Sequence, residues 1–145
     1  MILSDFLQLF KQGKVSAHSH MKNLIEMAMA DGHYDDVENK FLVKTASKHG
    51  VSKKTLTAIK ENKIEVEFIV PTSDQEKFTQ LFELVHMMVI DDHIDDEELK
   101  LCVIFAKKFG YSDIRSNELV ESMASNIKNG HNIQETQKRV NWLLN

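Results

Sequence analysis

Two short segments of the chain gather carboxylates around a histidine in a pattern that could bind a metal ion. The first reads ADGHYDDVE at residues 30–38, and the second reads IDDHIDDEE at residues 90–98. Carboxylates suit Ca²⁺, Mg²⁺ and Mn²⁺, whereas an imidazole nitrogen shifts the preference toward Zn²⁺ or another transition metal. The segments therefore predict a divalent-cation site for Ca, Mg, Mn or Zn. Its candidate ligands are Asp31, Asp35, Glu38, Asp91, Asp95 and Glu98, with His33 and His93 as weaker candidates.

A purely structural explanation accounts for part of the same pattern. Asp35 and Glu38 have the spacing of a capping box, in which an N-cap side chain and the third helical residue satisfy each other's backbone N–H groups. An Asp N-cap contributes about 1 kcal/mol to helix stability. Gly32 can adopt the left-handed conformation that ends the preceding helix. The second segment repeats the pair sixty residues later, with Asp92, which tolerates that conformation at some cost, in the place of the glycine.

Capping does not explain Asp31 and Asp91. Each lies in the last turn of its predicted helix, where the helix dipole disfavours a carboxylate by a few tenths to about 1 kcal/mol. A bound cation would relieve this repulsion. The segments are not EF-hand loops, because the glycine required at loop position 6 is Asp36 and the glutamate required at position 12 is Leu42.

The two acidic segments belong to a longer internal repeat. Residues 27–52 align without a gap with residues 87–112, and 12 of the 26 positions are identical. Such self-similarity at a fixed offset indicates a duplicated structural unit. We therefore expect a single domain, 1–145, built from two pseudo-symmetric helical repeats at an offset of 60 residues. The repeats span 16–61 and 74–129, and a connector spans 62–73.

Helical periodicity dominates the chain. Apolar residues recur at i, i+3, i+4, i+7 and i+8 from Met21 and again from Leu81, which is typical of one face of an amphipathic helix. One proline and five glycines leave few helix breakers. The predicted fold class is all-α with seven to eight helices. They lie near residues 3–11, 16–31, 36–49, 53–61, 74–91, 96–109, 114–129 and 133–144.

Turn residues mark several of these boundaries. Gly50 and Gly110 stand where a left-handed residue ends a helix. Ser52 and Ser112 follow as candidate N-caps, and Asn132 begins a capping box for the last helix. The stretch IEVEFIVP at 64–71 alternates like a strand but has no second strand to pair with. We interpret it as an extended connector, with a sheet shared between two chains as the alternative.

The first acidic segment resembles the signature of the TerB-like family, which includes the tellurite-resistance TerB proteins and the N-terminal domain of membrane-anchored J-proteins of the DjlA type. The signature is a small residue, Asp-Gly, a variable residue, a hydrophobic residue and a glutamate four positions further on. In this chain these are Ala30, Asp31, Gly32, His33, Tyr34 and Glu38. The second segment is similar through Asp91, Ile94 and Glu98, but Asp92 replaces the glycine. The resemblance covers residues 14–130.

This resemblance implies an all-helical domain with two pseudo-symmetric halves and a non-enzymatic role. It also implies a function in stress response and tellurite resistance. Members of the family are proposed to bind metal through these acids or to act as partners in membrane-linked complexes. The positions that carry the metal proposal are Asp31, Glu38, Asp91 and Glu98. The two histidines are not part of the signature.

Charge is distributed unevenly along the chain. Ten of the 22 acidic residues fall in the two acidic segments, which leaves 12 against 18 lysines and arginines elsewhere. We expect two acidic corners on a basic body, suited to an acidic protein partner or an anionic lipid surface. Nucleic acid is disfavoured because the lysines lack interleaved aromatic residues. The basic side comprises Lys44, Lys48, Lys53, Lys54, Lys60, Lys107, Lys108 and Arg115.

Other reactive residue types have structural interpretations. Glu83 and His86 have the Glu-x-x-His spacing of di-iron bundles, but the repeat places Asn23 and Glu26 at the equivalent positions, so the second half of such a site is missing. We expect His86 at the surface or the edge of the core. Cys102 is the only cysteine and is expected in the core. The helical methionines are interpreted as packing residues, with a Met-rich partner groove as the alternative.

The sequence leaves two hypotheses. The first is a non-enzymatic binding module whose acidic corners hold divalent cations and whose helix faces bind an unknown protein partner. The second is a metal-free helical adaptor for protein–protein interaction. The single cysteine favours a reduced, cytoplasmic setting, and no apolar stretch is long enough for a transmembrane segment. No nucleophile–base pair or phosphate-binding loop suggests an enzyme.

Overall fold

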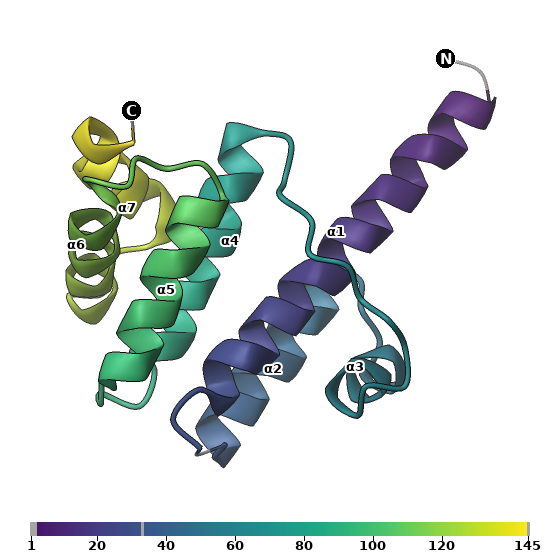
Figure 1. The fold of residues 1–145 in the computed structure, drawn as a ribbon, viewed down its shortest axis with the longest axis horizontal. Helices are drawn as coiled ribbons and strands as arrows, with labels where there is room; N and C mark the ends of the chain where they lie inside the picture. The colour runs from purple at the N-terminus through teal and green to yellow at the C-terminus, as the bar shows by residue number, and fades with distance from the viewer. Residues whose placement is uncertain (1–2, 33, 145) are drawn as a thin grey trace.

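The chain folds as a bundle of helices (Figure 1). The structure, a computed structural model, describes residues 3–32 and 34–144. Within these ranges there are seven α-helices, one 3-10 turn and no strand, which confirms the all-α prediction. In chain order the helices are α1 (Leu3–Met29), α2 (Asp36–Lys48), α3 (Lys53–Lys60), α4 (Asp74–Val89), α5 (Asp96–Lys108), α6 (Ser116–Lys128) and α7 (Ile133–Val140), followed by η1 (Asn141–Leu143).

Helices α1 and α4 form the centre of the bundle. They pack against each other; α2 and α3 pack on α1, and α5, α6 and α7 pack on α4. Both central helices run toward the same end of the molecule, and α2 and α5 each return from that end (Figure 1). The turns between α1 and α2 and between α4 and α5 are therefore neighbours. These turns carry the two acidic segments.

The predicted apolar faces form the core. Met21, Leu24 and Ala28 of α1 are buried, as are the periodic residues of α4, Leu81, Leu84, Val85, Met88 and Val89. Met29 is an exception, because it ends α1 where the chain leaves the helix interface, and it is 45% exposed. Cys102 is buried, and burial raises the pKa of its thiol well above the usual range. Its interpretation as a core residue is confirmed.

Helix α1 is longer than predicted. The expected break between helices at 3–11 and 16–31 does not occur, and α1 runs through Gly13 without interruption. A single glycine costs a helix about 1 kcal/mol but does not end it unless its φ is positive, which is not the case here. The described side chains of residues 3–15 are all exposed, and this part of α1 extends beyond the body of the bundle (Figure 1).

Most predicted boundaries agree with the structure. The hydroxyl of Ser52 accepts from the backbone N of Thr55 and caps α3, and a capping box begins α7 at Asn132. Ser112 is not an N-cap, which corrects the prediction. Residues 113–115 form a turn, and α6 begins only at Ser116, whose hydroxyl donates to the Ser112 carbonyl at 2.7 Å. The predicted helix at 114–129 is shorter for this reason.

The connector at 62–73 is extended and lies against the helices. The backbone N of Ile69 donates to Ser19 Oγ at 2.8 Å, and the ring of Phe68 stacks on Phe105 and Phe109. Residues 62–73 contain no strand, as the interpretation of an extended connector predicts for the single chain. No helix in the described part of the chain is both long and apolar enough to cross a membrane.

Candidate functional site

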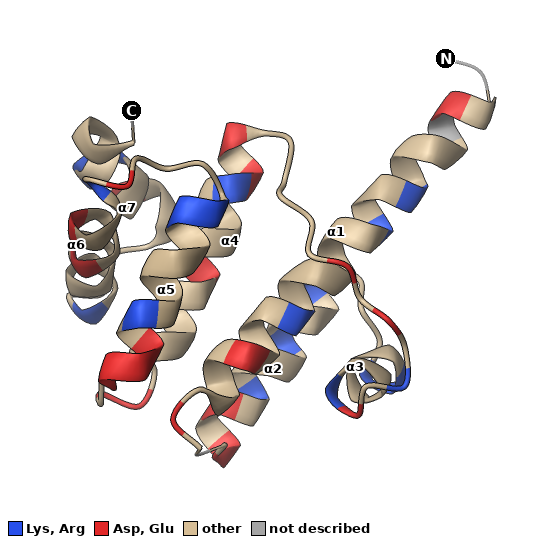
Figure 2. Ribbon diagram, viewed as in Figure 1, with Lys and Arg blue, Asp and Glu red and all other residues tan. Residues whose placement is uncertain are grey.

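The two acidic segments meet at one end of the bundle (Figure 2). Carboxylate oxygens of Asp35, Glu38 and Asp91 all lie within 4.8 Å of one another, so residues from both segments share one cluster. Asp31 and Glu98 interact electrostatically with this group. The charge of Asp31 raises the pKa of Glu38, and the charges of Asp31 and Glu38 raise the pKa of Glu98. We call these five residues the acidic corner cluster.

The first corner is built by a glycine and a capping box. Gly32 has φ +81° and reverses the chain after α1. Asp35 then caps α2: its Oδ1 accepts from the backbone N of Glu38 at 2.9 Å, and Glu38 Oε1 accepts from the backbone N of Asp35 at 3.5 Å. The predicted capping box is confirmed, and it fixes Glu38 on the buried side of the first turn of α2.

The second corner follows the same path with different contacts. Asp92 has φ +62°, so it takes the left-handed conformation predicted for it. Asp91 Oδ1 accepts from the backbone N of His93 at 3.1 Å. Asp95 is the N-cap of α5, but its Oδ1 accepts from the backbone N of Glu97 at 2.8 Å instead of that of Glu98. The reciprocal capping box of the first corner is therefore not repeated.

Two glutamates in the cluster are nearly inaccessible to solvent. Glu38 and Glu98 are each 3% exposed. The pKa of Glu38 is raised to about 7, chiefly by burial and to a smaller extent by the nearby carboxylates of Asp35, Asp31 and Asp91. Burial, followed by Asp31, Glu38 and Asp91, raises the pKa of Glu98 to about 8. At neutral pH the ion-free cluster therefore retains protons that a bound cation could replace.

The remaining predicted ligands, Asp95, His93 and His33, are not part of the acidic corner cluster. Asp95 serves as the N-cap of α5 and is not in the group of ligand atoms found among the described residues. His93 is exposed and is also not in that group. His33 lies outside the described residues. The cluster is thus made of carboxylates, and among described residues the histidines add nothing to it.

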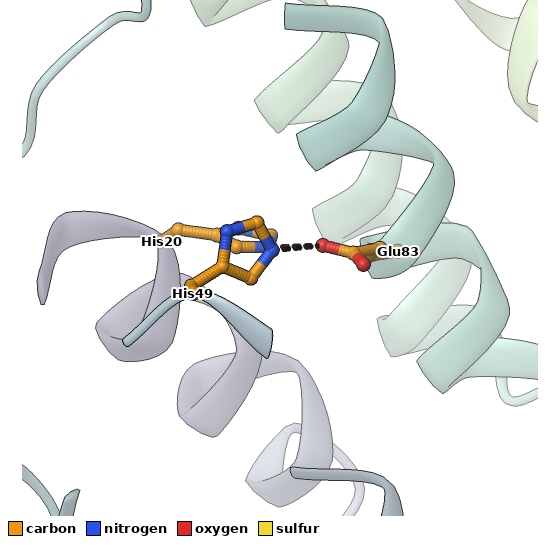
Figure 3. Close-up of side chains that lie close together, drawn as sticks. All are labelled: His20, His49 and Glu83. Carbon is orange, nitrogen blue, oxygen red and sulfur yellow. Dashed lines mark hydrogen bonds and ion pairs between the residues drawn. The ribbon is translucent and has the colours of Figure 1, made fainter. Parts of the chain in front are cut away.

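A second cluster, not predicted from the sequence, lies between α1, α2 and α4 (Figure 3). His20 of α1 and His49, the C-cap of α2, both point their Nε2 atoms at one oxygen of Glu83. The distances to Glu83 Oε1 are 2.8 Å from His20 and 2.7 Å from His49. Lys48 Nζ donates to the other oxygen, Oε2, at 2.9 Å. We call the three residues His20, His49 and Glu83 the interhelical cluster.

The protonation of this cluster follows from its surroundings. Burial lowers the pKa of His20, and the hydrogen bond and charge of Glu83 only partly offset this, so the ring is neutral at neutral pH. Burial alone would raise the pKa of Glu83, but hydrogen bonds from His20, His49 and Lys48 hold it well below its usual range. An ionised carboxylate can only accept hydrogen bonds, so His20 carries its proton on Nε2.

The only sign of this cluster in the sequence is that polar residues fall on the buried faces of two helices. His20 precedes Met21 on the buried face of α1, and Glu83 precedes Leu84 on that of α4. Polar residues at such positions must find partners, but periodicity does not say which. The sequence spacing pairs Glu83 only with His86. In the structure His86 instead contacts the rings of Phe41 and Phe82. His86 is half-buried at the edge of the core, as expected.

A groove lies beside the interhelical cluster. It has a volume of about 870 Å³ and is bounded by α2, α4 and the segment around the start of α7. Its apolar lining residues are Val37, Phe41, Phe82, Ile90, Ile127 and Ile133. Three lysines of α2 also line it, Lys40, Lys44 and Lys48. Two of them belong to the basic side predicted from the sequence.

Comparison of the chain with protein-family models, curated proteins and solved structures finds no match. The resemblance to the TerB-like family therefore depends on the residues of the two acidic segments alone.

Proposed function

We propose that this protein is a non-enzymatic, TerB-like binding module of the cytoplasm, with a role in stress response of the kind linked to tellurite resistance. In this proposal the two pseudo-symmetric halves of the chain each supply one acidic corner. The acidic corner cluster holds one divalent cation between them, and the helix faces are left for a protein partner.

The observation that supports this proposal is the burial of Glu38 and Glu98 in one cluster. The two residues come from different corners, and each is surrounded by further carboxylates. Bringing like charges together in a poorly solvated place is unfavourable unless protons or a cation neutralise them. A cation between the corners would use Asp35, Glu38 and Asp91 as its nearest ligands, because their carboxylate oxygens lie within 4.8 Å of one another, with Glu98 and Asp31 beside them.

The ligand chemistry favours a hard cation. All five members of the cluster offer carboxylate oxygens, which suit Ca²⁺, Mg²⁺ or Mn²⁺. Zn²⁺ would require nitrogen or sulfur ligands for strong selectivity. His93 is exposed and outside the cluster, so the geometry ranks Zn²⁺ below the other three ions at this position.

Calorimetric titration of chelator-stripped protein tests the proposal. We expect the wild type to bind Ca²⁺, Mg²⁺ or Mn²⁺ and the double variant Asp31→Asn, Asp91→Asn to lose this binding. Asp36→Asn with Asp96→Asn is the matched control, because it removes two exposed acids of the same segments that are not in the cluster. Since Glu38 and Glu98 retain protons near neutral pH, binding should release protons and strengthen from about pH 6 to about pH 9.

Two results would contradict the cation site. One is the absence of binding by the wild type in this pH range. The other is equal loss of binding in the cluster variant and in the control, which would mean that only the net charge of the segments matters. Either result would leave the acidic residues as helix caps.

A second candidate function is supported by the groove. Its apolar floor and its three lysines complement an amphipathic helix with acidic residues on its polar face. In this alternative the protein is a metal-free adaptor for an acidic helical segment of a partner, in a membrane-associated complex or elsewhere. Helix-in-groove binding requires no metal, so it would survive treatment with a chelator.

A designed peptide tests the adaptor function. A labelled helix with leucines at i, i+3, i+4 and i+7 and glutamates elsewhere should bind by fluorescence anisotropy, whereas the same helix with lysines in place of glutamates should not. The variant Phe41→Asp, which alters the groove floor, should abolish binding. Lys54→Glu, with its exposed side chain outside the groove, is the control for overall charge. Equal binding of both peptides would exclude a charge-selective groove.

A further inference from the structure

We infer that the interhelical cluster of His20, His49 and Glu83 is a second metal site, for Zn²⁺ or a similar transition-metal ion, separate from the acidic corner cluster. His20 lies nine residues before Met29, the last residue of α1, and Asp31 follows in the turn, which places the two clusters about 14 Å or more apart along that helix. Their ligand types also differ, so they would select different ions.

The geometry supplies three converging ligand atoms. One oxygen and two imidazole nitrogens, drawn from α1, α4 and the end of α2, lie within 4.8 Å of one another (Figure 3). Two histidines and a glutamate are the protein ligands of many zinc sites, which leave a fourth position open. With metal–ligand distances near 2.0–2.1 Å, tetrahedral ligands lie about 3.3 Å apart. The N···O distances of 2.7 and 2.8 Å therefore need to open by only about half an ångström.

The protonation states already match those of a metal site. A metal requires ionised carboxylate and neutral imidazole ligands. Glu83 is ionised because the hydrogen bonds that it accepts outweigh the effect of burial on its pKa, and His20 is neutral at neutral pH because burial lowers its pKa more than the hydrogen bond to Glu83 raises it. Metal binding at His20 Nε2 would move the ring proton from Nε2 to Nδ1 without changing the ring charge. This site therefore needs no proton release from His20.

The metal-free arrangement leaves polar atoms unsatisfied beside the cluster. His20 is fully buried, and its Nδ1 has no hydrogen-bond partner in the described structure. Gln80, also buried and one turn before Glu83 on α4, has an unpartnered Oε1. Its Nε2 donates to Ser16 Oγ at 3.3 Å, one turn before His20 on α1. Both orphan atoms thus lie in the same part of the α1–α4 interface, where a proton moved to Nδ1 would need an acceptor.

Access to the cluster is open from the side of His49. Its side chain is 19% exposed and lines a surface pocket together with Phe10, Lys14 and Val51. Lys48 binds the outer oxygen of Glu83, but its side chain is 61% exposed and can turn into solvent. Its ammonium group competes with a metal for the carboxylate, so Lys48 should weaken metal binding.

Cobalt titration tests this inference on the full chain after chelator treatment. Mg²⁺ is present in excess to occupy the acidic corner cluster, so that failure of one site does not affect the test of the other. We expect one Co²⁺ per chain, with the visible absorption of tetrahedral coordination, displaced by Zn²⁺. His49→Gln should weaken binding at least about tenfold. His86→Gln, a half-buried histidine outside the cluster, is the matched control and should bind as the wild type does.

The variant Lys48→Gln provides an independent arm that does not threaten the fold, because the side chain is exposed. It should bind Co²⁺ several-fold more tightly, since it removes the competing charge. Absence of a tetrahedral Co²⁺ spectrum in both the wild type and Lys48→Gln would overturn the inference. Equal affinity of the wild type, Lys48→Gln and a folded His49→Gln variant would also overturn it, leaving the cluster as a structural hydrogen-bond network.

Discussion

Buried glutamates in this molecule show how neighbours decide the charge of a carboxyl group. Glu38 and Glu98 are surrounded by other acids, and burial together with those acids raises their pKa values to about 7 and about 8. Glu83 is also buried, but two histidines and a lysine surround it, and its pKa is held below its usual range. One residue type thus supplies two kinds of candidate ligand: a proton-retaining group at the corners and a permanent anion between the helices.

The raised pKa values predict how the metal-free protein responds to pH. The folded state binds protons at Glu38 and Glu98 more tightly than the unfolded state does, so this contribution to stability is complete below about pH 4.5 and is lost as pH rises through 7 to 8. Between about pH 5.5 and about pH 8.5, the loss summed over the two groups should be on the order of 5 kcal/mol, since one pKa unit corresponds to about 1.4 kcal/mol. Urea unfolding in the presence of chelator measures it.

The substitution Glu98→Gln separates this effect from other pH effects. It removes one titrating group while keeping the side-chain shape, so the variant should be more stable than the wild type at about pH 8.5 without metal. Glu97→Gln, an exposed neighbour, should not change the pH dependence. A Glu98→Gln variant with the same pH profile as the wild type would show that Glu98 does not carry a raised pKa.

His20 should make the free energy of unfolding depend on pH in the opposite direction. Its pKa is lowered in the folded state, chiefly by burial, so its contribution is present above about pH 6.5 and is lost as pH falls below that value. Nuclear magnetic resonance of the ring protons should show His20 remaining neutral below the ordinary histidine pKa. A normal titration of His20 would contradict the environment described for the interhelical cluster.

At the scale of the elements, glycines have two different roles. Gly13 lies inside α1 with a helical φ, and a Cβ added there would meet no atom within 4 Å, whereas Gly50 follows α2 with φ +76°. Gly13→Ala should therefore stabilise the exposed start of α1 by about 0.5–1 kcal/mol. Gly50→Ala should destabilise the fold by roughly 1–2 kcal/mol, because alanine disfavours the left-handed conformation. Hydrogen exchange of α1 and thermal unfolding measure the two effects.

Local sequence decides which elements could be predicted. Helices α2 to α7, the left-handed Gly32 and Asp92 and the capping box of Asp35 depend on local sequence, and all were predicted. The continuity of α1 through Gly13 was not, because glycine weakens a helix without specifying whether it ends there. The prediction for Ser112 was wrong, since a serine can cap through its hydroxyl or accept through its carbonyl, as it does here.

The candidate sites depend more on tertiary structure than the elements do. The acids of the corners were predicted as ligands one segment at a time, and only the packing of α1 against α4 shows that Glu38 and Asp91 share a cluster. The convergence of His20, His49 and Glu83 spans 63 residues of sequence and has no local pattern. Sequence alone identifies buried polar residues as unusual, but it does not pair them.

At the scale of the whole molecule, both corners lie at one end because α1 and α4 run in the same direction (Figure 1). A cation held between them would connect α1 and α2 with α4 and α5, in addition to the apolar core and the connector. Binding to the folded state alone stabilises a protein by about 2.7 kcal/mol when the ligand is at 100 times its Kd. Such a gain should protect both corners together from hydrogen exchange.

Single and double variants can show whether the corners form one site or two. If one cation is shared, Asp31→Asn and Asp91→Asn each weaken the same binding event, and binding stoichiometry stays at one per chain until it is lost. Two separate sites would instead give a stoichiometry of two, and each single variant would lose one site and leave the other intact. The geometry favours the shared site, because carboxylate oxygens of Asp35 and Glu38 from the first corner and of Asp91 from the second lie within 4.8 Å of one another. Calorimetric titration of the two single variants beside the double variant therefore tests the geometry of the cluster directly: a stoichiometry of two in the wild type would show that the corners act independently.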